Sequence, residues 1–173
     1  MLNEVIENTE RFIASVPKAK RKKYGQFFTN STTAKFMASL FCFDLSKRKI
    51  EILDAGAGTG ILAAAVVQKL YELGYVGKIY VTCYETDELV MPLLEENMAL
   101  CNKLHNVYYT IKRENYVTSQ NFSNSTSFNN EDYQYDYIIG NPPYMKIAKD
   151  AAEALAMPEV CYGAPNLYFL FCA

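Results

Sequence analysis

Apolar positions along the chain recur at two spacings, and each spacing predicts one kind of element. Residues 2–16 carry apolar side chains at helical spacing, which predicts an amphipathic helix that ends before Pro17. Aromatic and β-branched runs indicate strands at residues 50–53, 78–84, 107–111 and 135–140. Helical patterns follow the first two runs, one from Ile61 to a cap at Gly74 and one beginning near Pro92. Strands that alternate with helices predict an α/β fold.

Shorter segments complete the predicted elements. Residues 146–156 are predicted as a short helix, and a further apolar element begins at Asn166. Residues 119–134 are rich in serine and asparagine without a hydrophobic period, which predicts a loop. One more helix carries Met37 and Leu40 on its apolar side, and its candidate N-terminal caps are Ser31, Thr32 and Thr33.

Composition narrows the class of protein. A chain of 173 residues, half of them hydrophobic, is one domain or part of one and can bury a sizeable core. The formal net charge of -2 argues against a surface built mainly for nucleic acid, although a basic run at residues 18–23 could contact phosphate as well as solvent. Five cysteines without C-x-x-C spacing predict reduced thiols and no metal site. Without a signal-type or membrane-spanning run, we expect a cytoplasmic protein that does not contact membranes.

A glycine-rich turn follows the first predicted strand. Residues 54–60 read Asp-Ala-Gly-Ala-Gly-Thr-Gly, and a helix begins directly after them. Glycines between a strand and a helix let the backbone approach a ligand closely, which is typical of a cofactor-binding turn. The spacing differs from G-x-G-x-x-G and lacks the Gly-Lys-Ser/Thr of a phosphate loop. Glu85 closes the second strand, where a carboxylate can accept ribose hydroxyls or cap the next helix.

Asn141-Pro142-Pro143-Tyr144 follows the fourth predicted strand. An amide oxygen and a backbone carbonyl can accept hydrogen bonds from a planar NH2 group, which frees the nitrogen lone pair for attack. Proline has no N–H to compete with those carbonyls, and the tyrosine ring offers a flat face. The same residues also fit a plain turn with a core tyrosine, so the tetrapeptide alone leaves both interpretations open.

These motifs, in this order, resemble the class I S-adenosylmethionine-dependent methyltransferases. More narrowly, the chain is similar to the DNA adenine-N6 methyltransferases of restriction-modification and phage-defence systems. The resemblance spans roughly residues 20–173 and implies a Rossmann-like sheet with flanking helices. It rests on Gly25 to Thr29, Asp54 to Gly60, Glu85, and Asn141 to Tyr144, with Asn166 to Tyr168 similar to the next family segment.

The resemblance implies S-adenosyl-L-methionine as the cofactor and a set of residues that would bind it. Phe28 and Thr29 would approach its methionine end, and Glu85 would hold the ribose. Asn115 would bond the adenine edge; the family more often has aspartate there, but asparagine can accept through its carbonyl oxygen. The whole cofactor-binding set is Phe28, Thr29, Asp54, Gly56, Gly58, Gly60, Glu85, Asn115 and Tyr116.

The same resemblance implies a catalytic role for Asn141, Pro142 and Tyr144. An adenine flipped out of DNA would stack on Tyr144, while the Asn141 amide and the Pro142 carbonyl accept from its amino group. The methyl group would pass in line from the sulfonium to the adenine nitrogen.

By the resemblance, residues 1–23 form a helix and a basic linker, and residues 24–173 form the N-terminal part of a catalytic domain. The family's later strands, second stacking aromatic and DNA-recognition region have no counterpart among these residues. We therefore expect DNA binding to need a C-terminal region or a complementing subunit, and cofactor binding by this chain to be weak.

Three other functions stay open on the sequence. Protein glutamine methyltransferases use the same turn on a side-chain amide, although they lack the Phe-Phe-Thr segment before the glycine loop. Methylation of adenine in RNA is a second alternative. The third is a module without activity that binds a partner subunit.

Overall fold

The computed structural model describes residues 1–17, 28–119, 135–161, 163 and 165–172. These residues form one sheet of four parallel strands, β1 (Lys49–Ala55), β2 (Lys78–Tyr84), β3 (Val107–Lys112) and β4 (Tyr137–Ile139). The spatial order is β3-β2-β1-β4. The chain therefore runs outward from β1 to β3 and then returns to the other side of β1. The predicted Rossmann-like α/β fold is confirmed.

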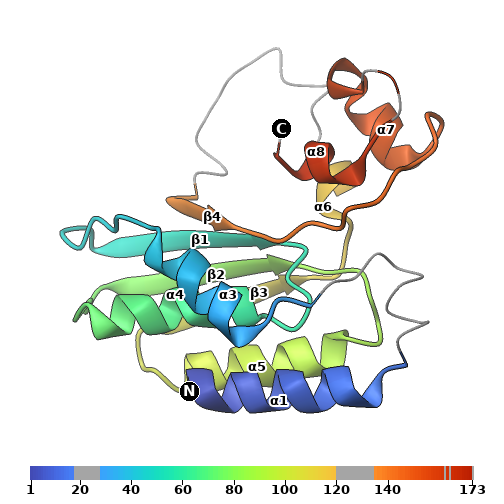
Figure 1. Cartoon of the computed structure of the whole chain (residues 1–173). Coiled ribbons are helices and arrows are strands. Elements are labelled where there is room, and N and C mark those ends of the chain that lie inside the picture. Colours follow the sequence, from blue (N-terminus) through green and yellow to red (C-terminus); the bar gives the residue numbers. More distant parts are fainter. Residues whose placement is uncertain (18–27, 120–134, 162, 164, 173) are drawn as a thin grey trace.

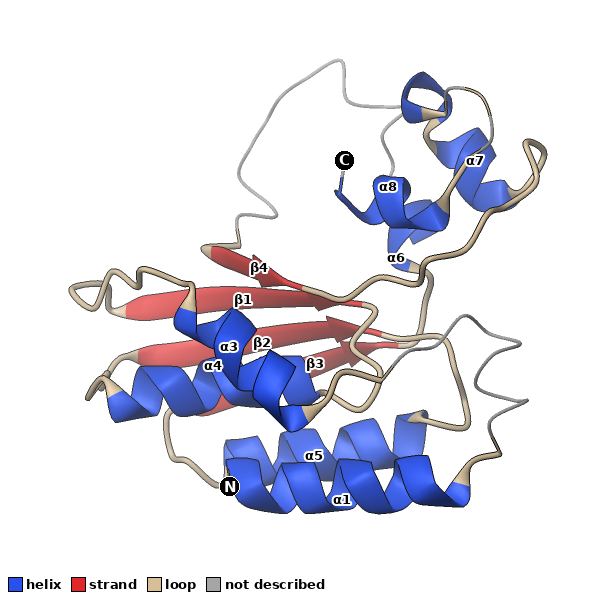
Figure 2. Cartoon of the chain, viewed as in Figure 1, coloured by secondary structure: helices blue, strands red, loops and turns tan. Residues whose placement is uncertain are grey.

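Helices lie on one face of the sheet and near its carboxyl end. The first group lies beside the sheet in Figure 1 and shares a single hydrophobic core with the strands. Its members are α1 (Leu2–Ser15), α3 (Ser31–Ser39), α4 (Ile61–Glu72) and α5 (Met91–Asn102). The second group gathers near the arrowheads of the strands (Figure 2) and consists of α6 (Tyr116–Ser119), α7 (Ala152–Ala156), the 3-10 helix η2 (Pro158–Val160) and α8 (Leu167–Cys172). Within the described ranges, no helix is long and apolar enough to span a membrane.

Successive side chains of a strand point to opposite faces of the sheet, so the two faces pack against different groups of residues. Ile50 and Ile52 of β1 point into the main core, where they meet α4. Leu53 and Ala55 point to the opposite face and form a small cluster with Tyr84 at the end of β2. Side chains of α6 and α8 pack against this second cluster, which holds the second helix group beside the strand ends.

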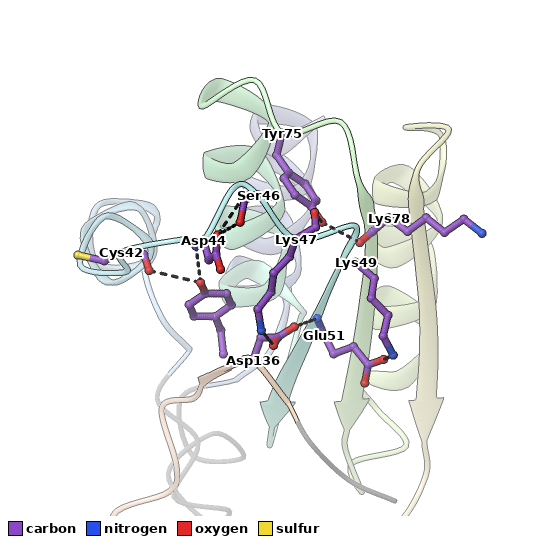
Figure 3. A network of polar contacts seen from close by, with 10 residues as sticks. Cys42, Asp44, Ser46, Lys47, Lys49, Glu51, Tyr75, Lys78 and Asp136 are labelled. Atoms are coloured by element: carbon purple, nitrogen blue, oxygen red, sulfur yellow. Dashed lines mark hydrogen bonds and ion pairs between the residues drawn. The ribbon is translucent and has the colours of Figure 1, made fainter. Parts of the chain in front are cut away.

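A polar network fixes the opposite, amino end of the sheet (Figure 3). Lys47 pairs with Asp136, and the other oxygen of that carboxylate accepts from the backbone N–H of Glu51 at 2.8 Å. The Tyr137 hydroxyl accepts from the N–H of Asp44 at 2.8 Å. These contacts bind the start of β4 to the start of β1, so β4 is anchored at the end that lies away from the glycine turn.

Three local predictions were wrong at least in part. Only Ala152–Ala156 of the predicted helix 146–156 is helical, because Lys146 forms an antiparallel bridge with Asn166 instead. The N-terminal cap of α3 is Asn30, whose side chain accepts from the N–H of Thr33 at 2.8 Å. The loop was predicted from residue 119, but Ser119 is the last residue of helix α6. The predictions for the basic run at 18–23, for residues 25–27 and for the remainder of that loop, 120–134, lie outside the described residues.

Candidate functional site

A cavity of about 480 Å³ lies at the carboxyl ends of the strands. Its lining includes residues that follow each of the four strands within one or two positions, at 56–59, 85–88, 114–116 and 141–145. Open α/β sheets bind ligands where neighbouring connections diverge to opposite sides of a strand, and here that point lies between β1 and β4. Of the twelve residues predicted for the site, ten line this cavity, and Asp54 and Gly60 do not.

The glycine turn adopts a backbone conformation that residues with a Cβ atom rarely take. Gly56, Gly58 and Gly60 have φ of +83°, +55° and +77°, a left-handed region that L-residues rarely occupy. A Cβ at Gly60 would lie 2.8 Å from both Leu94 and Met98. Gly60 therefore serves packing between the turn and α5, while Gly56 and Gly58 present bare backbone to the cavity.

Asp54 lies beneath the turn rather than in the cavity wall. It is fully buried, and its Oδ2 accepts from the N–H of Ala63 at 3.2 Å. Gly60, the N-cap of α4, has no side chain, so Asp54 supplies the capping acceptor from the strand. Its Oδ1 has no partner among the described residues. Burial raises the pKa of the Asp54 carboxyl from 3.8 to about 7, with the Ala63 bond opposing the rise and Glu85 adding to it.

Glu85 joins the end of β2 to the glycine turn. Its Oε2 accepts from the N–H of Gly58 at 2.7 Å, and its Oε1 accepts from the N–H groups of Thr86 and Asp87 at 2.7 and 2.8 Å. The carboxylate thus holds the turn in place and also lines the cavity. A carboxylate offers about four acceptor sites, so it retains capacity for a ligand hydroxyl.

Asn115 and Tyr116 follow β3 and sit at the base of α6. The side-chain oxygen of Asn115, Oδ1, accepts from the N–H groups of Val117 and Thr118 at 3.0 and 3.4 Å, which caps α6. Its Nδ2 donates to Glu153 Oε1 of α7 at 2.8 Å. The half-buried Tyr116 ring lines the cavity and meets the edge of Tyr84, with centroids 5.2 Å apart.

The Asn141 amide is oriented by Thr29. Its Nδ2 donates to Thr29 Oγ1 at 3.1 Å, which turns the carbonyl oxygen of the same amide away from that hydroxyl. Pro142 follows on the cavity wall. The Tyr144 ring is 60% exposed and stacks on Tyr168 of α8, with centroids 5.0 Å apart and planes at 14°. One face of Tyr144 is therefore covered by the protein itself.

Phe28 closes the cavity next to the glycine turn. A Cβ at Gly58 would lie 4.0 Å from its ring, and the ring packs edge-on against Phe12 of α1 with centroids 5.7 Å apart. Helix α1 also reaches the turn directly, because Thr9 Oγ1 donates to Thr59 Oγ1 at 3.1 Å in a buried setting. The first helix thus supports the cavity wall from behind.

Several residues of this site were missed in the sequence. Asn97 of α5 is buried and donates to the Thr59 carbonyl at 2.8 Å. A polar residue inside an apolar helical stripe is the signal that could have found Asn97 and Thr9. Glu153 belonged to a predicted helix, and no local pattern links it to Asn115, which lies 38 positions earlier.

The charged side chains that line the cavity, within the part of the chain that the structure describes, are all acidic. They are Glu85, Asp87, Glu88, Glu114 and Glu153. Such a wall favours a cationic ligand and disfavours phosphate groups. No group of three or more histidine, cysteine or acidic side chains among the described residues could hold a metal ion.

Known proteins of similar sequence transfer methyl groups. Type II methyltransferase M.PstI of Providencia stuartii is 34% identical over 157 residues, covering 88% of this chain and 30% of that protein. Type II methyltransferase M.BsuBI of Bacillus subtilis is 30% identical over 177 residues, covering 99% and 35%. A release factor glutamine methyltransferase of Fusobacterium nucleatum is 36% identical over 121 residues, covering 69% and 28%. The chain spans about a third of the length of these relatives.

A structural match and a family profile indicate the same class of protein as these relatives. A solved structure from Listeria monocytogenes, described as a class I S-adenosylmethionine-dependent methyltransferase, superposes with a TM-score of 0.66 at 17% identity. The match covers 99% of this chain and 48% of that one, which shows a shared fold. The family profile described as N-6 DNA Methylase matches residues 5–156. The chain therefore belongs to the N-6 DNA methylase family.

Proposed function

We propose that the cavity binds S-adenosyl-L-methionine and that the protein methylates the N6 amino group of adenine in DNA. The observation that carries the proposal is the Asn141 amide, which Thr29 orients beside the glycine turn. A methyl donor on that turn and an amino group held by Asn141 would then meet in one cavity. The family assignment and the two Type II methyltransferase relatives support the same chemistry.

The cavity fits the proposed cofactor in shape and charge. S-adenosyl-L-methionine has a sulfonium and an ammonium against a single carboxylate, so it is cationic overall and suits the acidic lining. Gly56 and Gly58 would let its amino-acid part lie against the backbone. Glu85 would accept from a ribose hydroxyl, and the Tyr116 ring would flank the adenine. Bound there, the cofactor supplies an electrophilic methyl group on a good leaving group.

The residues after β4 would prepare the accepting nitrogen. Asn141 Oδ1 and the Pro142 carbonyl would accept the two N–H groups of the amino substituent, which frees the lone pair of its nitrogen. Pro142 and Pro143 have no backbone N–H, so the backbone here offers the amino group carbonyl acceptors without adjacent donors. A flipped base would stack on the face of Tyr144 that Tyr168 does not cover. Positioning and fixed acceptors would supply most of the rate enhancement of methyl transfer, because no strong base is needed when the leaving group carries a positive charge before transfer.

The assignment is tested by replacing Asn141. We expect Asn141→Ala to lower methyl transfer about 100-fold or more, because acceptors set for developing charge contribute that much to catalysis. Cofactor affinity should stay within about 2-fold, since Asn141 acts on the substrate amino group. Calorimetry measures the affinity, and tritium incorporation into DNA measures transfer.

The control is Asn102→Ala, an exposed asparagine at the end of α5, which should change neither quantity. Equal loss of cofactor affinity and transfer in Asn141→Ala would contradict the proposed role. The substrate class is decided by offering labelled cofactor with DNA, RNA or a release-factor protein. Label in a glutamine amide would place the chain with the Fusobacterium nucleatum relative instead.

A further inference from the structure

The contacts of Asn115 leave its side chain poorly suited to recognise the 6-amino group of adenine. Both acceptor directions of its carbonyl oxygen are used, by the N–H groups of Val117 and Thr118. One N–H of its Nδ2 donates to Glu153. The 6-amino group of adenine needs an acceptor, and the acceptor of this side chain caps α6, so Asn115 cannot accept from that amino group unless the cap of α6 is broken.

We propose that Glu153 of α7 is the residue that recognises the 6-amino group of the cofactor's adenine, and that Asn115 positions it. This inference rests on the proposed binding of S-adenosyl-L-methionine in the cavity. Glu153 lines that cavity and is half-buried. Its Oε1 is held by Asn115, and its Oε2 has no partner among the described residues. An ionised carboxylate can only accept, and an amino group can only donate, so the two are complementary.

The position of Glu153 is set from two directions. Helix α7 packs on α6 and α8, and Ala154, the neighbour of Glu153, is buried. The bond from Asn115 then fixes the carboxylate at the end of β3, next to the Tyr116 ring that also lines the cavity. The recognising oxygen and the flanking ring thus reach the same part of the cavity from different elements.

Hydrogen-bond polarity gives this inference a sharp test. In Glu153→Gln, the Asn115 Nδ2 keeps its acceptor only if the new amide turns its oxygen toward Asn115. The NH2 of the glutamine then takes the place of Oε2, so the group offered to the ligand changes from acceptor to donor. A donor opposes the 6-amino group of adenine but suits the 6-oxo group of hypoxanthine.

The experiment compares two probes by calorimetry, S-adenosylhomocysteine with its 6-amino group and S-inosylhomocysteine with a 6-oxo group. The unaltered chain should bind the adenine probe about 10–100-fold more tightly, as expected for a hydrogen bond to a charged group. In Glu153→Gln this preference should vanish or reverse. A purely structural role for Glu153 would weaken both probes together and leave their ratio unchanged.

Glu159→Gln is the matched control, because Glu159 is an exposed acid of η2 outside the cavity lining. It should retain the preference of the unaltered chain. If Glu153→Gln binds both probes with the original ratio, the role of Glu153 is refuted while the proposed function stands. If the unaltered chain binds neither probe, both the cofactor assignment and this inference are overturned.

Discussion

Replacing Asp54 with asparagine should change how stability depends on pH. The buried carboxyl has a pKa of about 7 in the folded chain, against 3.8 ordinarily. The folded state therefore holds the proton more tightly than the unfolded state, and Asp54 lowers the free energy of unfolding as pH rises from about 4 to about 7. At about 1.4 kcal/mol for each pKa unit, the full loss is about 4 kcal/mol, and about 3 kcal/mol of it falls between pH 4.5 and 8.

Asp54→Asn removes this titration but keeps an acceptor for the N–H of Ala63. Its new NH2 group replaces an oxygen that has no partner among the described residues, which adds a cost of about 1–3 kcal/mol that does not vary with pH. The stability of the variant relative to the unaltered chain should therefore rise by about 3 kcal/mol from pH 4.5 to 8. Urea unfolding followed by circular dichroism at several pH values measures that difference.

Asp44→Asn provides the control for this experiment. Asp44 is exposed, and hydrogen bonds from the Ser46 side chain and backbone lower its pKa. A carboxyl with a lowered pKa loses its stabilising effect only as pH falls below its ordinary range, so this difference should be flat from pH 4.5 to 8. A flat difference for Asp54→Asn as well would refute the argument that a buried, charged Asp54 strains the fold.

Three other predictions concern packing and thiols. Gly60→Ala should lower the free energy of unfolding by about 2–4 kcal/mol through backbone strain and overpacking. Gly74 has φ of +75° and open space around it, so Gly74→Ala should cost only about 1 kcal/mol, and equal losses in urea unfolding would contradict the packing role of Gly60. Thr9→Val should cost about 1–3 kcal/mol by leaving a buried hydroxyl of the glycine turn without its partner, and Thr9→Ser should cost less; the melting temperatures decide. Exposed Cys42 should react with a disulfide reagent at pH 8, while Cys101, whose pKa burial raises to about 12, should react only after unfolding, as mass spectrometry of the labelled chain would show.

The sequence by itself determined the elements whose signals are local. The strand at 78–84 was predicted with the bounds that β2 shows, because alternating apolar side chains fit a pleated strand with one buried face. The glycine turn and the residues from Asn141 were expected at strand ends, and the parallel sheet brings them to one cavity. Parallel strands share one carboxyl edge, so the order of motifs along the chain was enough to assemble this part of the site.

Tertiary structure alone decided which polar groups face the cavity. Asp54 was expected at the ligand, but it lies beneath the turn and caps α4, since a neighbouring N–H lies within its reach. Asn115 is committed to α6 and to Glu153, a residue 38 positions away. Lys146 pairs with Asn166, and only residues 152–156 of the predicted helix 146–156 are helical. Hydrogen bonds depend on which groups meet in space, and local periodicity cannot predict partners that lie that far apart in the sequence.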